Sequence, residues 1–533
     1  MSLPSDFFKV QHLVGKRIIR RNETTDISGA NVFNGRIFVL RNEAWEPHLS
    51  HAAGIADIFS INLEFEYSIY DDSPLSYPVN RNIPVLIWLN WDRVLNKEKY
   101  IQDLAEIYES RNPLYLVLPR GPKKFVNEFK NFVSSRINKL KIIQIVSDAD
   151  LGKQFISGYS HNEMLEISTY IGQNIAVQLF YPEIKAIISD LDNTLYKGIL
   201  GEDNLHGLVL TSEYKLLQDK ILELFNHGVL INLVSKNNAS EVDILMSYAR
   251  IISIPKEKFT YIIASWNKKS ESVSSILQKL NFDQESTVFI DDNPRELFEI
   301  GLTHPRILAI DASNPSEVIK ILGCDIFSKS KTATIKSDQR SRDIQANEIR
   351  FKKLSSKKTS QNILRLMGTK IMSKSAESVL EIERAEELFR KTNQFNFSNQ
   401  RSKMEMTINK EVAGCIISSL SDIYSDSGII SAFKYVVEPN SDIVVQEFVI
   451  SCRALGREVE RLILKSILNR CAEEEIFKED SKVFFIFNKS ERNLPAQEFI
   501  KKGFAINSSN KLMEMDKNYW TTLDEKMEGL TNW

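Results

Sequence analysis

Short apolar runs alternate with longer stretches of helical periodicity along the middle of the chain. The apolar runs have the length of strands and lie at residues 184–189, 229–234, 259–263, 287–290 and 306–310. The stretches between them repeat apolar residues three and four positions apart, as at Leu217, Ile221 and Leu224. Strands that alternate with amphipathic helices are typical of a parallel sheet covered by helices. We therefore predict an α/β domain over residues 183–330.

The amino-terminal part of the chain has the same kind of pattern. Strand-like runs lie at residues 36–40, 83–89, 114–118 and 142–146, and helical patterns lie at 97–111 and 123–139. This alternation predicts a second α/β domain over residues 1–182. The acidic and aromatic stretch at residues 64–72 fits either a contact surface or a loop between a helix and a strand.

The pattern changes near residue 371, where strands begin to follow one another directly. A helical stretch at 377–392 precedes strand-like runs at 403–408, 414–419, 429–437 and 442–450, and then come a helix at 458–471, a strand at 482–487 and a helix at 495–502. This order predicts an α+β domain with antiparallel strands over residues 371–533. The charged segment 331–370 predicts a connector with an exposed helix at 338–350, which could also lie against the mouth of the central domain.

Two carboxylates follow the first apolar run of the central domain. Asp190 and Asp192 lie at its carboxyl end, which is the end of an open α/β sheet where ligands bind. Two carboxylates aimed at one point repel each other unless a divalent cation lies between them, and Mg²⁺ prefers oxygen ligands. A single pair of aspartates after a strand is more often an ordinary turn. Here, however, polar residues also follow two later strands, which favours phosphoryl transfer.

The order of these polar residues resembles the four motifs of the haloacid-dehalogenase (HAD) superfamily. The matching residues are Asp190, Asp192 and Thr194 after the first strand, Ser235 after the second, Lys269 before a helix, and Asp291 with Asp292 after the fourth strand. The resemblance implies that Asp190 is the nucleophile that attacks phosphorus and that Asp192 is the general acid and base. It also implies a Rossmann-like HAD fold.

The remaining HAD positions have implied roles in binding. Ser235 and Lys269 would hold the transferring oxygens. Lys269 is preferred to Lys268 because the family places its lysine directly before a small residue, here Ser270. The implied Mg²⁺ ligands are the carboxylates of Asp190, Asp291 and Asp292 together with Asp192, which would contribute its backbone carbonyl. Thr194, Ser235 and Lys269 are too close in sequence for a large cap domain, so we expect an open site that admits macromolecular or carrier-bound substrates.

The composition describes an ordinary water-soluble chain of several domains. The chain has 533 residues, a formal net charge of -2 and four cysteines without a CxxC pair. The length exceeds that of a single core, and the charge disfavours nucleic acid as a partner. The spacing of the cysteines disfavours a zinc site or disulfide framework. Because the start lacks a signal-like segment and no apolar run approaches about 18 residues, we expect a cytoplasmic protein without a membrane partner.

Four blocks of sequence together resemble the FkbH-like family, which is HAD subfamily IIIC. The blocks lie at residues 190–203, 290–296, 390–396 and 451–460. The resemblance implies that 1,3-bisphosphoglycerate, a small phosphorylated three-carbon substrate, loses phosphate and that its glyceryl unit is loaded as a thioester on an acyl carrier protein for polyketide or related assembly. The chain departs from the family at Tyr196-Lys197, where Trp-Gly is common.

The flanking domains also resemble parts of this family. The turn Arg453-x-x-Gly456-Arg457 and the terminal pattern from Asn493 to Phe504 resemble the GNAT acyltransferase fold, although Arg457 stands where that fold prefers Gly or Ala. Relatives carry an esterase-like SGNH domain on the amino-terminal side. Since no Gly-Asp-Ser motif follows residues 36–40, we expect residues 1–182 to form an SGNH-like domain that docks partners or substrate without hydrolysis.

Cys452 is the candidate nucleophile for acyl transfer. It lies between a strand and a helix amino terminus and beside Arg453, and both features favour a thiolate. A thiolate that attacks an acyl phosphate would carry the glyceryl group, whereas the alternative is a cysteine that only packs. The predicted substrate-binding residues are Thr194, Asn393, Gln394, Asn396, Arg453, Gly456 and Arg457.

Three other functions remain open at this point. The chain could be a plain Mg²⁺-dependent phosphatase with a degenerate carboxyl-terminal half. It could be a GNAT-type acyltransferase whose HAD domain only binds, or a scaffold for carrier proteins without enzymatic activity. The complete set of acidic motifs argues against the scaffold.

Overall fold

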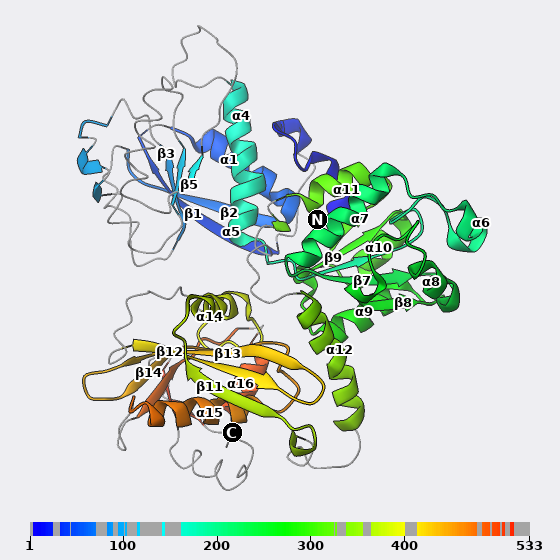
Figure 1. Cartoon of the computed structure of the whole chain (residues 1–533). Coiled ribbons are helices and arrows are strands. Elements are labelled where there is room, and N and C mark those ends of the chain that lie inside the picture. Colours follow the sequence, from blue (N-terminus) through cyan, green and yellow to red (C-terminus); the bar gives the residue numbers. More distant parts are fainter. Residues whose placement is uncertain are drawn as a thin grey trace.

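The molecule contains three β-sheets in three separate parts of the chain (Figure 1). The computed structural model describes residues 4–24, 32–42, 44–70, 83–88, 94–96, 98–100, 102–103, 114–117, 141–143, 161–324, 326–327, 337–354, 364–399, 413–476, 482–490, 493–501, 504–506 and 512–515. Within these ranges, no helix combines the length and the apolar character that a membrane span requires. Two sheets are parallel and the third is mixed, so the fold is a mixed α/β fold.

The amino-terminal sheet consists of five parallel strands in the order β2-β1-β3-β4-β5. Its strands are β1 (Phe33–Arg41), β2 (Ile61–Tyr67), β3 (Val85–Trp88), β4 (Leu114–Val117) and β5 (Lys141–Ile143). Helices α1 (Glu46–Ala56), α4 (His161–Tyr170) and α5 (Ala176–Phe180) follow one another along this sheet. The four predicted strands are confirmed. The predicted helix at 97–111 lies mostly outside the described residues, and the predicted helix at 123–139 lies entirely outside them.

Strand β2 contradicts the predicted loop at residues 64–72. Glu64 and Glu66 lie within β2 and both form ion pairs with Arg36 of β1, at 3.3 and 3.0 Å. Leu63 between the strand's polar positions is buried. Glu64 and Glu66 therefore belong to an edge strand, where charge discourages pairing with another chain.

The central sheet consists of five parallel strands in the order β10-β9-β6-β7-β8. Its strands are β6 (Ala186–Ser189), β7 (Leu230–Ser235), β8 (Phe259–Ala264), β9 (Thr287–Asp291) and β10 (Leu308–Asp311), all of them predicted. Every residue of β6, β7 and β9 is buried, as expected for parallel strands that helices cover on both faces. The strand order reverses next to β6, and such a switch point opens a crevice at the carboxyl ends of the strands.

Six helices accompany the central sheet. They are α6 (Leu200–Gly207), α7 (Ser212–Asn226), α8 (Ala239–Met246), α9 (Lys269–Leu280), α10 (Pro294–Thr303) and α11 (Pro315–Leu322). Helix α6 projects away from the rest of the molecule in Figure 1. It is the only helix in the segment that joins β6 to α7, and this whole segment is described, so no large cap is inserted here.

The first described residues pack on the central sheet although they precede the amino-terminal sheet in sequence. Gln11 exchanges two hydrogen bonds with the backbone of Asp311 at the end of β10, at 3.0 and 2.8 Å. The Ser5 amide donates to the carbonyl of Pro305 at 3.3 Å. The amino-terminal and central parts of the chain are therefore joined at more than the covalent connection between α5 and β6.

The carboxyl-terminal sheet is mixed and has the order β11-β12-β13-β14-β15-β17-β16. Its strands are β11 (Lys370–Ser375), β12 (Ala413–Ser421), β13 (Asp426–Val437), β14 (Ile443–Ile450), β15 (Val483–Ile486), β16 (Phe504–Ile506) and β17 (Leu512–Met515). Helix α14 (Val379–Lys391) covers one face and α15 (Glu460–Glu473) the other, with α16 (Leu494–Ile500) before β16 (Figure 1). The predicted strand at 403–408 lies outside the described residues, and β11, β16 and β17 were not predicted.

Helix α12 (Ser337–Leu354) joins the central and carboxyl-terminal sheets. The prediction that it is exposed is wrong, because Asp343, Ile344 and Arg350 are buried. On the central side, Gln345 donates to the carbonyl of Thr260 at 2.8 Å, and Thr260 lies near the amino end of β8. The helix therefore does not lie at the carboxyl ends of the strands, and the alternative of a helix over the mouth of the central domain is also wrong.

Candidate active site

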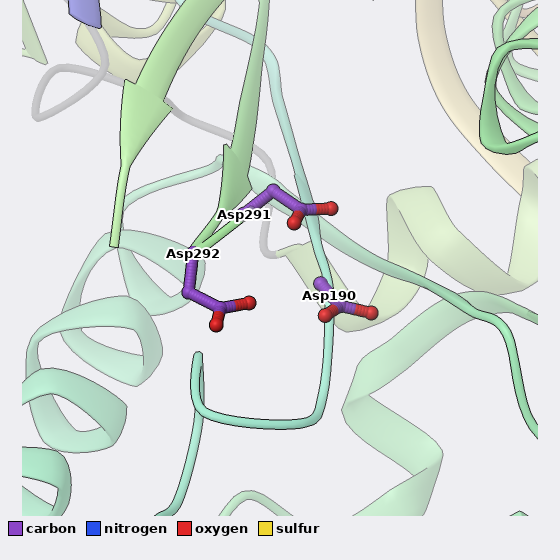
Figure 2. Close-up of side chains that lie close together, drawn as sticks. All are labelled: Asp190, Asp291 and Asp292. Atoms are coloured by element: carbon purple, nitrogen blue, oxygen red, sulfur yellow. The ribbon is translucent and has the colours of Figure 1, made fainter. Parts of the chain in front are cut away.

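Three carboxylates meet at the carboxyl ends of β6 and β9. Asp190 follows β6, Asp291 ends β9 and Asp292 comes next. The two strands are neighbours, and the Asp190 amide donates to the carbonyl of Ile290 at 2.9 Å. One oxygen of each carboxylate lies within 4.8 Å of the others, and Figure 2 shows the three side chains around a common space. Asp190 and Asp291 are buried, so the group lies inside the crevice and not on its rim.

Lys269 is the cation of this group. Its Nζ lies 2.9 Å from Asp190 Oδ1 and 2.6 Å from Asp291 Oδ2. Lys269 begins α9 and is buried, whereas Lys268 is exposed. Burial lowers the pKa of Lys269, but the carboxylates of Asp190 and Asp291 outweigh this effect and raise it overall, so the ammonium stays charged.

The group carries more negative than positive charge. Burial and the neighbouring Asp291 carboxylate raise the pKa of Asp190, against the opposing effect of Lys269. Burial likewise raises the pKa of Asp291. Three carboxylates beside one ammonium leave room in the charge balance for a divalent cation, and carboxylate oxygens are the ligands that Mg²⁺ prefers. The donor set formed by Asp190, Asp291 and Asp292 thus fits Mg²⁺.

Asp192 does not place its carboxylate in this group. Oδ1 accepts hydrogen bonds from the Tyr196 hydroxyl at 2.5 Å and the Leu200 amide at 2.9 Å, and Oδ2 accepts one from Asn237 Nδ2 at 2.6 Å. The expected metal ligand from Asp192 is its backbone carbonyl, so these side-chain contacts leave that expectation a prediction. Burial and the charge of Asp192 raise the pKa of Tyr196, which keeps the phenol protonated as the donor.

A tight turn accounts for the different directions of Asp190 and Asp192. Asn193 has a left-handed backbone conformation, with φ of 51°, which asparagine tolerates better than most residues. Its amide donates to the carbonyl of Gly198 at 3.1 Å, and its side chain accepts from the Gly198 amide at 3.0 Å. The loop is thereby closed on itself directly after the two acids, which holds the Asp192 carboxylate toward the start of α6.

Thr194 and Ser235 are both buried beside the acids. Thr194 Oγ1 accepts from the Asp292 amide at 3.2 Å, so Thr194 supports the chain at Asp292 and does not face a substrate. Ser235 ends β7, and its Oγ accepts from Asn237 Nδ2 at 2.8 Å. Asn237 thus bridges Ser235 and Asp192. Sequence reasoning missed Asn237, although its place two residues after a strand end that carries a polar residue was an available signal.

The predicted carboxyl-terminal residues form a separate group at the other end of β6. Cys452, Arg453, Asn393 and Gln394 line a cavity together with Lys185, which directly precedes β6. The five-residue step from Lys185 to Asp190 corresponds to about 16 Å along an extended strand. The structure therefore does not bring Cys452 together with Asp190.

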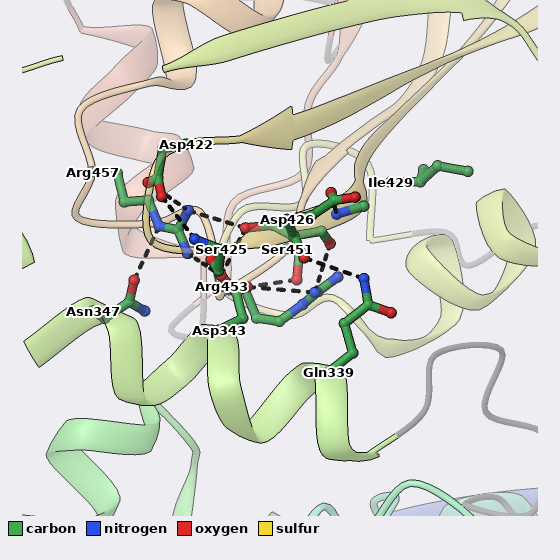
Figure 3. A network of polar contacts seen from close by, with 12 residues as sticks. Gln339, Asp343, Asn347, Asp422, Ser425, Asp426, Ile429, Ser451, Arg453 and Arg457 are labelled. Carbon is green, nitrogen blue, oxygen red and sulfur yellow. Dashed lines mark hydrogen bonds and ion pairs between the residues drawn. The ribbon is translucent and has the colours of Figure 1, made fainter. Parts of the chain in front are cut away.

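Arg453 and Arg457 contact the connector helix. Arg457 Nη2 donates to Asp343 Oδ1 at 2.7 Å, and Arg453 Nη1 lies 3.5 Å from Asp343 Oδ2 (Figure 3). Arg457 is buried within this network, which differs from its predicted contact with substrate. Gly456 has φ of 79° and so permits the turn between β14 and α15, where no ligand-binding role is visible.

Asn396 is also used internally. Its side chain donates to the carbonyl of Thr392 at 3.1 Å and accepts from the Asn399 amide at 2.8 Å, and it is fully buried. Strands β14 and β15 pair with each other only over Ile443–Val445 and separate after that. Residues 395–398 lie between the separated strands, and the Phe397 amide donates to the carbonyl of Phe448. Asn396 therefore cannot bind a substrate in this structure, whereas Asn393 and Gln394 face the cavity.

Solved structures similar to this chain include the following three. No protein-family model matches the chain, and no curated protein matches it. The amino-terminal part of BF1531 from Bacteroides fragilis, which contains a phosphatase domain complexed with Mg, is 15% identical, with a TM-score of 0.41 over 60% of this chain and 98% of that chain.

The other two structures match a smaller share of the chain. One, from Vibrio cholerae, is described as a 3-deoxy-D-manno-octulosonate 8-phosphate phosphatase and is 16% identical, with a TM-score of 0.20 over 28% of this chain and 87% of that chain. The other, from Legionella pneumophila, is described as a HAD superfamily (subfamily III A) hydrolase and is 16% identical, with a TM-score of 0.21 over 31% and 90%.

Proposed function

We propose that this protein is a Mg²⁺-dependent phosphatase in which Asp190 attacks the phosphorus of a phosphate ester. The observation that carries this proposal is the buried group of Asp190, Asp291 and Asp292 around Lys269, at the carboxyl ends of two adjacent parallel strands. A carboxylate is a competent nucleophile toward phosphorus when positive charge neutralises the phosphate. This geometry agrees with the roles that the HAD resemblance assigns.

The chemistry can be written with the residues of the chain. Bound Mg²⁺ would supply charge that neutralises the phosphate oxygens, next to the Lys269 ammonium. An Asp190 oxygen forms a bond to phosphorus as the bond from phosphorus to the ester oxygen breaks, which gives an aspartyl phosphate. Asp192, oriented by Tyr196 and Asn237, protonates the leaving alcohol and then takes a proton from water, which hydrolyses the aspartyl phosphate. The products are the alcohol and inorganic phosphate.

The test is phosphate release by Asp190→Asn. The amide has the size of the carboxylate but is not a nucleophile, so we expect the Mg²⁺-dependent rate to fall at least about a thousandfold. Asp311→Asn is the matched control, because Asp311 ends β10, the strand next to β9, and lies outside the acid group. This variant should release phosphate at nearly the normal rate. Wild-type turnover by a folded, Mg²⁺-saturated Asp190→Asn protein would overturn the assignment.

The resemblance to FkbH-like proteins supports a more specific proposal for the whole chain. The Cys452 thiolate would attack the carbonyl carbon of 1,3-bisphosphoglycerate, and the bond to the acyl phosphate would break to release phosphate. The thiol of an acyl carrier protein would then take the acyl group. The remaining 3-phosphate would be hydrolysed at Asp190. Cations favour a cysteine thiolate, and the cavity wall contains Arg453 and Lys185 beside Cys452.

The Cys452 cavity and the acid group at Asp190 are separate, so the two proposed steps can be tested independently by measuring the mass of the protein and of its products. The two steps must be separate binding events, because about 16 Å of strand lies between Lys185 and Asp190. We expect Cys452→Ser to lose the acyl adduct and carrier loading while it keeps phosphatase turnover. Asp190→Asn should still acquire the adduct but retain the 3-phosphate. Cys324→Ser is the control, since Cys324 is also partly exposed but lies after α11.

A plain phosphatase is the second candidate, and one observation favours it. Residues 395–398 occupy the space between β14 and β15, and the side chain of Asn396 is fully buried with both of its polar atoms bonded within its own segment. If the carrier protein leaves phosphate release unchanged and no acyl adduct forms on Cys452, this simpler function is the correct one.

A further inference from the structure

A cavity of about 60 Å³ lies between the amino end of the central sheet and the carboxyl-terminal sheet. Its wall comes from the residue before β6, the end of α9, the start of α12, helix α14 and the loop after β14. Two contacts hold these parts together next to it: Lys391 pairs with Glu183 at 2.7 Å, and Gln394 donates to Asn281 at 3.2 Å. The cavity is therefore a fixed feature of the junction and is separate from the acid group.

The wall of the cavity carries an excess of positive charge. Its cations are Lys185, Arg340, Arg384, Lys391 and Arg453, and its acids are Asp283 and Glu387. Glu387 is already engaged by Arg384 at 2.6 Å and by Lys391 at 2.8 Å. Among the described residues, Lys185 and Arg340 make no ion pair. Lys185 donates to the backbone carbonyl of Lys391, and Arg340 donates to the backbone carbonyl of Gly228.

Arg453 is one of the residues that line the cavity, and one of its side-chain donors is unsatisfied. It is 4% exposed, and its Nη2 has no hydrogen-bond partner among the described residues. Burial and the nearby Arg384 lower the pKa of Arg453 to about 10, even though Asp343 opposes the shift. Burial also lowers the pKa of Lys185. Buried positive charge that is not matched by negative charge is costly, and an anion in the cavity would offset that cost.

We propose that this cavity binds a phosphate group, contacted by Arg453, Lys185 and Arg340. A buried water needs roughly 10 to 15 Å³ of such space, so a cavity of about 60 Å³ holds about four to six water-sized atoms, which is enough for the oxygens of phosphate. Gln394 and Asn393 add neutral amides to the same wall. The proposal rests on the charge and size of the cavity, and it holds whether or not Cys452 carries an acyl group.

Cys452 provides a local readout because it lies on the cavity wall. The experiment uses the full chain with Cys324→Ser, since Cys415 and Cys471 are buried. The alkylation rate of Cys452 by iodoacetamide is followed by mass spectrometry without Mg²⁺, with and without inorganic phosphate. We expect phosphate to slow alkylation in a saturable manner. The same protection in Asp190→Asn would show that the phosphate does not act through the acid group.

Charge variants of the wall identify the binding residues. Lys185→Gln and Arg340→Gln, which change two partly buried residues, should each raise the phosphate concentration for half protection about tenfold, because a hydrogen bond to a charged group is lost. Lys279→Gln, which removes an exposed lysine of α9, should leave it unchanged. Protection by glycerol 3-phosphate at lower concentration than by inorganic phosphate would identify a phosphate ester as the ligand, and the reverse order would identify free phosphate.

Two results of the protection experiment would exclude a phosphate site in the cavity. If neither phosphate compound protects Cys452, or if Lys279→Gln weakens protection as much as the wall variants, the cavity is not a phosphate site. If Cys452 resists alkylation altogether, the increase in unfolding temperature that phosphate causes in Asp190→Asn is measured instead. Lys185→Gln and Arg340→Gln must abolish that increase. None of these results depends on Mg²⁺-dependent phosphate release, so the phosphatase proposal stands or falls separately.

Discussion

Asp343→Asn should strongly destabilise the junction between α12 and the carboxyl-terminal sheet. Asp343 is fully buried, and its carboxylate accepts from Arg457 at 2.7 Å, Ser425 at 2.6 Å and Ser427 at 2.8 Å. Arg350 and Arg453 each approach it to 3.5 Å. The variant keeps the volume but removes the only charge that Asp343 offers these guanidinium groups. Removing one partner of a buried ion pair costs about 3 to 5 kcal/mol, so we expect a loss of this size in the free energy of unfolding.

Asp338→Asn is the matched control on the same helix. Asp338 pairs with Lys258 at 2.9 Å, but its side chain is 44% exposed, so its loss should cost less than about 1 kcal/mol. Urea unfolding followed by circular dichroism and by tryptophan fluorescence measures both variants against the wild type. A loss for Asp343→Asn no larger than that for Asp338→Asn would refute the inference that the buried network holds the junction.

The pH dependence provides an independent check of the same reasoning. Although burial opposes it, the charge of Arg457 and then Arg453 lowers the pKa of Asp343 below its ordinary value. A carboxyl whose pKa is lowered by folding stabilises the protein above its unfolded pKa of about 3.9 and loses this contribution as the pH falls through the folded value. The difference between wild type and Asp343→Asn should therefore be constant near neutral pH and shrink below about pH 4.

Two further predictions concern the acid group. Burial raises the pKa of Asp190 and Asp291, so protons compete with Mg²⁺ for these carboxylates. The Mg²⁺ affinity measured by calorimetry should therefore increase between about pH 5 and pH 8. An affinity that does not change with pH would contradict this prediction. Tyr196→Phe removes the hydroxyl that donates to Asp192, so phosphate release should slow about tenfold or more. The control Tyr214→Phe loses a hydrogen bond to the carbonyl of Asn193, and its rate should stay within about twofold of the wild type. Equal rates for the two variants would exclude a positioning role for Tyr196.

The sequence by itself determined the strands of the central sheet and the residues at their ends. A strand buried on both faces must be continuously apolar, so β6 and β9 and the acids that follow them were recognisable from local pattern alone. The preference for Lys269 over Lys268 also came from local spacing, and the structure buries Lys269 beside the acids. In β2, the alternation through Glu64, Phe65 and Glu66 was an available strand signal that its acidic composition obscured.

Only the tertiary structure decided which distant groups meet. The charges of α12 suggested a solvated helix, because the partners of Asp343 and Arg350 come from strands and turns far along the chain. Asn396 looked available for a ligand until the divergence of β14 and β15 created a space that its own segment fills. Asp190 and Cys452 were assigned to different domains from the sequence, but only the packing showed that the Cys452 cavity lies at the opposite end of β6 from Asp190. Local periodicity reports which side of an element is buried, whereas the identity of the neighbour depends on the packing of the whole chain.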